Sequence, residues 1–172
     1  MSQIHWSGGC QCGAVRYQLL EKPTGAHICH CRMCQKQFGS FFAALASVPK
    51  DKFHLTRGQM SNFRSSADVQ RGFCKDCGTP LTYDPMTRDS ISIAIATLDR
   101  HSEVMPEVQY GTEGREPWFN DLHKLPAYPT GEDETGSDAF AALLPEINRS
   151  NRQHPDKDTD HWPQQGEPNG EN

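Results

Sequence analysis

The chain of 172 residues is 35% hydrophobic and 23% charged, which predicts one domain with an appendage, and no apolar stretch approaches the ~20 residues of a membrane span. Residues 131–172 hold ten acidic and three basic side chains, whereas residues 1–130 are nearly neutral and lack a basic run that would bind nucleic-acid phosphates. The first residues lack the basic and apolar regions of a secretion signal, so we expect a reducing cytoplasm, where clustered cysteines are more often metal ligands than disulfides.

Short strands separated by turns make up most of the predicted elements. The apolar pattern predicts strands over residues 4–7, 14–20, 40–48, 53–56, 60–63, 69–73, 79–83 and 90–98, and an irregular segment over 106–118. In the last of these strands Ile91, Ile93 and Ile95 share one face, opposite small polar residues or alanine. One or two helical turns are expected at residues 32–38, which are followed by Gly39. This pattern indicates an all-β domain of short antiparallel sheets.

The acidic segment 131–172 has a composition typical of disorder. Its one exception is a set of apolar residues at helical spacing: Phe140, Leu143, Leu144 and Ile147. They predict a short helix over residues 138–147. We therefore expect a first domain over residues 1–130 and a largely disordered acidic tail over 131–172, with His154 and His161 in solvent.

The seven cysteines divide into a group of four and a group of three. Cys10-x-Cys12 and Cys74-x2-Cys77 are each followed by glycine, and paired motifs of this kind predict one four-sulfur zinc site. An odd number of cysteines fits a disulfide framework badly, and the βαβ setting of a redox Cys-x-x-Cys is absent. Zinc bound by all four thiolates has no room for a substrate, so this site is expected to stabilise the fold.

The group of three has the spacing C-x-C-x2-C at Cys29, Cys31 and Cys34. Three protein ligands leave one tetrahedral zinc position open, as in catalytic sites. The alternative is a closed site, because His27 would share a face with Cys29 on an extended chain, whereas His30 would point the other way. An open position can hold a substrate thiol as a thiolate, which can add to a carbonyl carbon or leave from it. The open site therefore predicts a carbon–sulfur lyase.

Cations near the group of three are candidates to hold the carboxylates of a peptide-like thiol: Arg32, Lys36 and Arg71. Ordinary surface cations are the alternative interpretation. Trp118 and Phe119 can either wall a pocket or pack in the core, and we favour the core.

These motifs resemble the glutathione-dependent formaldehyde-activating enzyme family, which shares its domain with centromere protein V. The matching segments cover residues 9–17, 29–36 with Gly39, 71–79 and 97–99. The resemblance implies a β-tent fold, a structural zinc on the group of four, a catalytic-type zinc on the group of three, and glutathione as co-substrate. It also implies a lyase that forms S-hydroxymethylglutathione from glutathione and formaldehyde. One departure is that members often carry a histidine where Gln109 or Tyr110 stands.

Two functions follow from the sequence. The first is a zinc-dependent carbon–sulfur lyase that acts on an adduct of a small thiol. The second is a non-catalytic, zinc-stapled module that binds a protein or a small thiol. The nearly neutral body argues against a nucleic-acid partner, and the oligomeric state is left open.

Overall fold

The structure is a computed structural model that describes residues 6–130 and 138–160. Its contacts divide the chain into two units. The first unit comprises Met1–Arg115 and His154–Trp162, and the second comprises Glu116–Gln153 and Pro163–Asn172. The domain boundary predicted at residue 130 stays a prediction.

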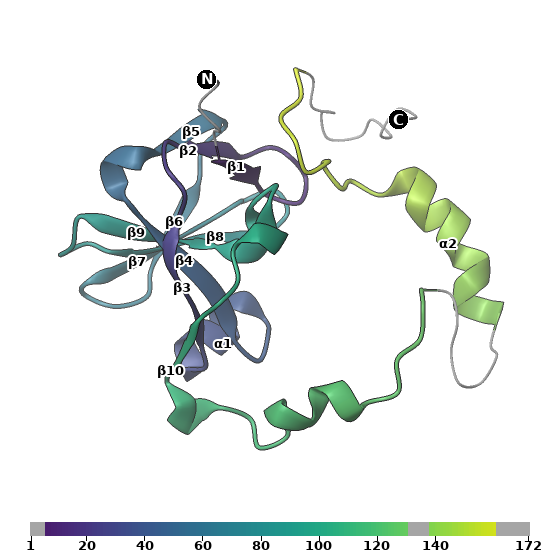
Figure 1. Ribbon diagram of the computed structural model, residues 1–172. Coiled ribbons are helices and arrows are strands. Elements are labelled where there is room, and N and C mark those ends of the chain that lie inside the picture. The colour runs from purple at the N-terminus through teal and green to yellow at the C-terminus, as the bar shows by residue number, and fades with distance from the viewer. Residues whose placement is uncertain (1–5, 131–137, 161–172) are drawn as a thin grey trace. The chain divides into compact units, whose positions relative to one another are not determined.

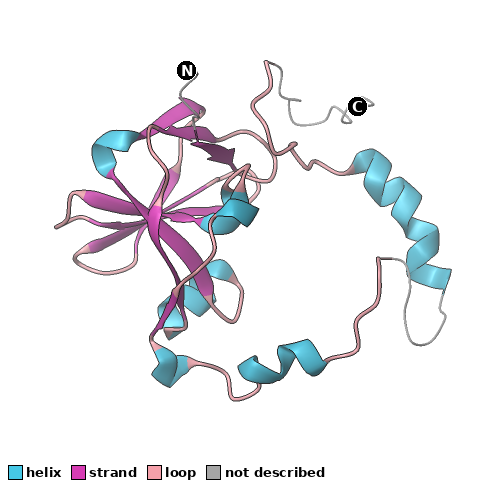
Figure 2. Cartoon of the chain, viewed as in Figure 1, coloured by secondary structure: helices cyan, strands magenta, loops and turns pink. Residues whose placement is uncertain are grey.

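The first unit is built from two β-sheets and one short α-helix within its described residues (Figures 1 and 2). The strands are β1 (Trp6–Gly9), β2 (Arg16–Leu19), β3 (Thr24–Cys29), β4 (Ala43–Pro49), β5 (Phe53–Arg57), β6 (Ser61–Arg64), β7 (Val69–Phe73), β8 (Pro80–Pro85), β9 (Ser90–Ala94) and β10 (Val108–Tyr110), and the helix is α1 (Arg32–Phe38). Short 3-10 turns cover Lys50–Lys52, Ile95–Thr97, His101–Glu103 and Thr112–Gly114. The predicted all-β class is confirmed.

The smaller sheet has the order β1-β2-β5 and the larger has the order β10-β3-β4-β9-β8-β7-β6. Strand pairs are antiparallel except β10, which pairs with β3 in parallel. The predicted strands all have counterparts among the described residues, but β3 and β10 were missed. In β10 the reason is plain: three exposed residues form a strand only because β3 supplies its hydrogen bonds.

The prediction of a strand over 90–98 was too long. After Ala94 the chain turns, and the hydroxyl of Thr97 donates a hydrogen bond to the Ala94 carbonyl at 2.8 Å. The helix over 32–38 is confirmed, and it ends at Gly39 in the left-handed region with φ 58°. Glycine takes that conformation without the penalty that a Cβ imposes.

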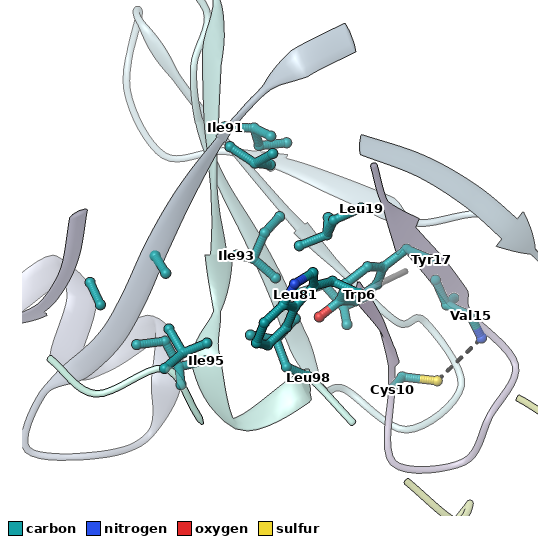
Figure 3. Close-up of a cluster of buried hydrophobic side chains, with 14 of the residues drawn as sticks. Trp6, Cys10, Val15, Tyr17, Leu19, Leu81, Ile91, Ile93, Ile95 and Leu98 are labelled. Atoms are coloured by element: carbon teal, nitrogen blue, oxygen red, sulfur yellow. Dashed lines mark hydrogen bonds between the residues drawn. The ribbon is translucent and has the colours of Figure 1, made fainter. Parts of the chain in front are cut away.

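The main core lies between the two sheets, where apolar side chains of β2, β4 and β9 meet (Figure 3). Ile91 and Ile93 share one face of β9, as predicted, and are buried, and they pair across the ladder with Val48 and Ala46. Ile95, which was predicted to share that face, lies in the 3-10 turn after the strand. Directly paired residues point to the same side of a sheet. The opposite face of the larger sheet therefore carries the alternate residues, and that face bears the candidate site.

The second unit contains a 3-10 segment (Phe119–Lys124) and the helix α2 (Asp138–Ser150). The helix predicted over 138–147 is confirmed and extends three residues further, with Pro145 inside it. Trp118 is 39% exposed, so the expectation of a core position was wrong for this residue. Neither described α-helix has the length and apolar character that a membrane crossing requires.

The expectation for the tail needs one correction. His154 was predicted to lie in solvent, yet only 7% of its surface is exposed, because it packs against residues of the first unit. Residues 131–137 and 161–172, including His161, lie outside the described residues.

Candidate metal centres

The group of four is brought together by two loops far apart in the sequence. Cys10 and Cys12 follow β1, whereas Cys74 and Cys77 follow β7, and the four sulfurs lie within 4.8 Å of one another. The Cys10–Cys12 and Cys12–Cys74 sulfur separations are 3.6 and 3.9 Å. A zinc tetrahedron with 2.3 Å bonds has sulfurs about 3.8 Å apart. The donor set and its spacing therefore fit a soft divalent metal.

Hydrogen bonds prepare these sulfurs to carry negative charge. The backbone N–H of Val15 donates to Cys10 Sγ at 3.3 Å (Figure 3). Burial raises the pKa of the Cys10, Cys12 and Cys74 thiols to about 11. Burial also raises the pKa of Cys77, but hydrogen bonds from Thr79 and from Cys12 outweigh it and lower that pKa to about 6. The protein alone holds one thiolate here, and a bound cation would stabilise the others.

The group of three sits where β3 ends and α1 begins. Cys29 is the last residue of β3, Cys31 precedes α1 with extended φ and ψ of −60° and 147°, and Cys34 lies in the first turn of the helix. The three sulfurs lie within 4.8 Å of one another. Among the described residues, no further histidine, cysteine or carboxylate atom completes this group. The local change from strand to helix thus gathers three ligands from six consecutive residues.

The neighbouring histidines make other contacts. His27 Nδ1 lies 2.9 Å from the Gly25 carbonyl oxygen, and its ring meets Tyr110 edge-on at 5.2 Å. His30 is fully buried, with Nε2 2.9 Å from Oε1 of Gln109. His27 shares the sheet face of Cys29, as alternation predicts, but it does not join the sulfur group.

Gln109 and Tyr110, which stand where members of the family often carry a histidine, both make contacts near the group of three. Gln109 is the partner of His30, while Tyr110 pairs with Cys29 in the parallel ladder and lines the same cavity.

Arg71 is the cation that contacts the sulfur group. It is 2% exposed, donates from Nη2 to Cys34 Sγ at 3.5 Å and from Nε to Ser65 at 3.2 Å, and lies over the ring of Tyr83. Its Nη1 is buried and has no hydrogen-bond partner among the described residues. A buried donor of this kind costs free energy until an acceptor reaches it.

The thiols of this group differ in acidity. Burial raises the pKa of Cys29 to about 12. Burial also raises the pKa of Cys34, with the Arg71 guanidinium opposing that rise. In Cys31 burial is outweighed by hydrogen bonds with the Cys34 N–H and the neighbouring thiols and by the charge of Arg71, so its pKa is lowered. Cys31 is therefore the most acidic of the three thiols, and a bound divalent cation would favour the thiolate form of all three.

A cavity of about 400 Å³ opens over these sulfurs. It lies on the face of the larger sheet opposite the core, where a ladder of paired residues runs across four strands: Ser47, Ser92, Tyr83 and Arg71. Ser90 and Arg88 also line it, and no aspartate or glutamate is among its described lining residues. Two arginines without a carboxylate favour an anionic ligand.

The three predicted cations separate in the structure. Arg71 lines the cavity, and Lys36 lines a second cavity of about 390 Å³ that shares Arg71 and Met33 with the first. Arg32 lines neither and donates to Gln35 at 3.1 Å.

Arg88 and the serines were missed. The signal was present in Ser90-Ile91-Ser92-Ile93, because residues that alternate with core isoleucines must face the other side.

Together these features place the protein in the class of β-sheet domains with two groups of cysteines that are suited to bind metal. The family model described as glutathione-dependent formaldehyde-activating enzyme matches residues 5–113, a range that contains all seven cysteines. The chain belongs to this family. The resemblance drawn from the motifs is thereby confirmed.

Curated relatives carry the same description. A Phaeosphaeria nodorum protein and a Penicillium rubens protein, both named "Putative glutathione-dependent formaldehyde-activating enzyme", are 34% identical over 84 and 76 residues. These matches cover 45% and 42% of this chain, and 44% and 40% of the relatives. An uncharacterized lyase of Schizosaccharomyces pombe is 28% identical over 78 residues, which are 45% of this chain and 56% of that protein. The chain thus spans about half the length of the curated relatives it matches.

A solved structure of a Rhodobacter sphaeroides protein aligns with 60% of this chain and 98% of its own, at 24% identity and a TM-score of 0.49.

Proposed function

We propose that this chain is a zinc-dependent carbon–sulfur lyase acting on the adduct of a small thiol with an aldehyde. The type reaction is the formation of S-hydroxymethylglutathione from glutathione and formaldehyde. The observation that carries the proposal is the group of three sulfurs exposed to a cavity lined by Arg71 and Arg88. Membership in the family and the names of its relatives support the same activity.

The two cysteine groups take different roles in this proposal. Cys10, Cys12, Cys74 and Cys77 hold a structural zinc, and Cys29, Cys31 and Cys34 hold a catalytic-type zinc. Zinc held by the group of three would supply an open ligand position and would lower the pKa of a thiol bound there. Binding of the substrate and transfer of its proton are carried out by side chains of the protein.

Binding and orientation of the thiol come from the cavity walls. The Nη1 of Arg71 lacks an acceptor, and a substrate carboxylate is the natural one, with charge-assisted hydrogen bonds. Arg88 lines the same cavity, and Lys36 lines the adjoining one. A thiol with two carboxylates, such as glutathione, matches this distribution of cations better than a neutral thiol does.

Proton movement is assigned to His27. Because Nδ1 lies against the Gly25 carbonyl, it carries the hydrogen, and Nε2 is the acceptor. In the synthetic direction, the thiol proton passes to Nε2 as the carbon–sulfur bond forms. The same proton then goes to the aldehyde oxygen, which becomes the hydroxyl of the product, so that atoms and charge balance.

We also infer a reducing, cytoplasmic setting and a small-molecule thiol as the partner, with no nucleic-acid partner. The cysteines of the described residues are free thiols, and the cavity is suited to a small anion.

The experiment is exchange NMR of the interconversion between glutathione plus formaldehyde and their adduct, because this reaction also proceeds without a catalyst. We expect stoichiometric zinc-loaded protein to raise the exchange rate above the spontaneous rate, and Cys31→Ser to return it to that rate. An exchange rate equal to the background with the intact protein would remove the lyase activity. If glutathione still binds in that case, the chain is a thiol-binding module.

A further inference from the structure

Seven residues near the C-terminus pack against the loop that carries Cys10 and Cys12 (Figure 1). We call this segment, residues 154–160, the strap. The N–H of His154 donates to the carbonyl of Gln11, between the two cysteines, at 2.7 Å. The His154 ring covers Gly13, where a Cβ would overlap its Cδ2 atom. The strap therefore touches the residues on both sides of Cys12.

Charged groups hold the strap in place. Asp158 accepts a hydrogen bond from Nε of Arg16 at 2.8 Å. Arg57 donates to the Gly13 carbonyl and lies 3.3 Å from Nε2 of His154, and it also donates to the Thr159 carbonyl. One arginine thus joins the strap to the cysteine loop directly.

The surface beneath the strap is complementary to it in charge. Arg16 is 2% exposed and forms a two-pronged ion pair with Asp99, whose side chain is 7% exposed. Arg16 meets one buried carboxylate, that of Asp99, and Asp158 of the strap supplies a second, exposed one at 2.8 Å, while Arg57 lies nearby against the Thr159 carbonyl. Buried or half-buried arginines are stable only where such partners are supplied. An acidic segment is therefore the occupant that this surface fits.

We propose that the strap is a working part of the four-cysteine site, and that it slows the loss of metal from Cys10, Cys12, Cys74 and Cys77. Cys10 and Cys12 can leave the metal only if the turn over residues 10–13 opens, and within that turn the strap donates a hydrogen bond to Gln11 and packs on Gly13. Cys12 is half-buried and lies beside this contact. The strap lies outside residues 5–113, the part of the chain that the family model matches.

The test uses the full chain loaded with zinc and measures metal transfer to a chromogenic chelator. Asp158→Asn removes the ion pair with Arg16, and His154→Ala removes the cover on Gly13. We expect release from the four-cysteine site to become about two- to fivefold faster in Asp158→Asn, the range of ion pairs with a solvent-exposed partner, because the side chain of Asp158 is 57% exposed. The matched control is Asp156→Asn, which removes the same charge from a strap residue that is exposed like Asp158 but is not the partner of Arg16 in that ion pair.

Hydrogen–deuterium exchange localises the effect. Exchange of the amides in residues 10–15 should rise in Asp158→Asn and His154→Ala but not in the control, while metal release from the group of three should stay unchanged. Equal release by all three variants and the intact chain, or an equal acceleration in the control, would overturn the proposal. Because no turnover is measured, this outcome is independent of the lyase activity.

Discussion

Both groups offer cysteine sulfurs as ligands, but they differ in the sequence separation of their members and in their access to a cavity. The group of four joins loops that are 62 residues apart at their closest members, and its sulfurs receive hydrogen bonds from within the protein. The group of three comes from six consecutive residues and opens onto a cavity with a buried arginine. Sequence separation therefore makes the first group a determinant of the fold. The cavity is the reason that we propose the second group as the site of chemistry.

The largest expected effect is a difference in stability between two variants that each lose one cysteine sulfur, one from each group. Cys74→Ser should abolish cooperative folding at 25 °C, because metal binding contributes folding free energy of about 10 kcal/mol or more in small zinc domains. Cys31→Ser should keep the native circular dichroism and thermal transition but lose thiol binding. The two melting curves, recorded side by side, are the measurement. If Cys31→Ser melts as low as Cys74→Ser, both groups are structural.

The next effect concerns the cation that borders the open group. Arg71→Met should raise the KM for glutathione about tenfold or more, because a buried charge-assisted hydrogen bond to the substrate is lost. Arg32→Met is the matched control, since Arg32 was predicted to act alongside Arg71 but lines neither cavity. A similar rise in KM for both variants would contradict the assignment of Arg71.

Arg88 should have a smaller effect because it is exposed to solvent. Arg88→Ala is expected to raise the KM for glutathione about two- to fivefold, the range of exposed ion pairs. The KM for 2-mercaptoethanol, which has no carboxylate, should not change. Steady-state kinetics with the two thiols gives the comparison, and an equal effect on both would exclude carboxylate binding by Arg88.

The smallest effect is a pH dependence of the strap. Burial, together with the charges of Arg16 and Arg57, lowers the pKa of His154 below its ordinary value, against the opposing charge of Asp99 and the Pro155 carbonyl. The docked strap thus favours neutral His154. Its contribution to stability is complete above the unfolded pKa of about 6.5 and declines as the pH falls through that value toward the docked pKa.

The measurement is the NMR titration of the His154 ring, whose midpoint should lie below about 6.5 in the intact chain. Asp158→Asn, which loosens the strap, should move the midpoint toward that ordinary value. A midpoint at the ordinary value in the intact chain would show that the ring is not enclosed.

Local patterns in the sequence predicted much of this molecule. The helix before Gly39, the shared face of Ile91 and Ile93, and the grouping of Cys29, Cys31 and Cys34 depend on neighbours a few residues away. The strand β10 and the wall residue Arg88 depend on strand pairing and register, which composition does not encode. The strap was misjudged because an acidic, proline-containing segment is typical of disorder, and its order comes from Arg16, 142 residues from Asp158.

The alternation in β9 has a consequence for how this protein can diversify. Its isoleucines pack between the sheets, while Ser90 and Ser92 border the cavity. Consecutive residues of this strand therefore contribute either to the core or to the cavity wall. Exchanging the serines for other small side chains would change the shape of the cavity wall and leave the packing between the sheets untouched. An inserted residue in the same strand would reverse both faces at once. Substitution, rather than insertion, is therefore the change that can reshape the cavity wall while the core is kept.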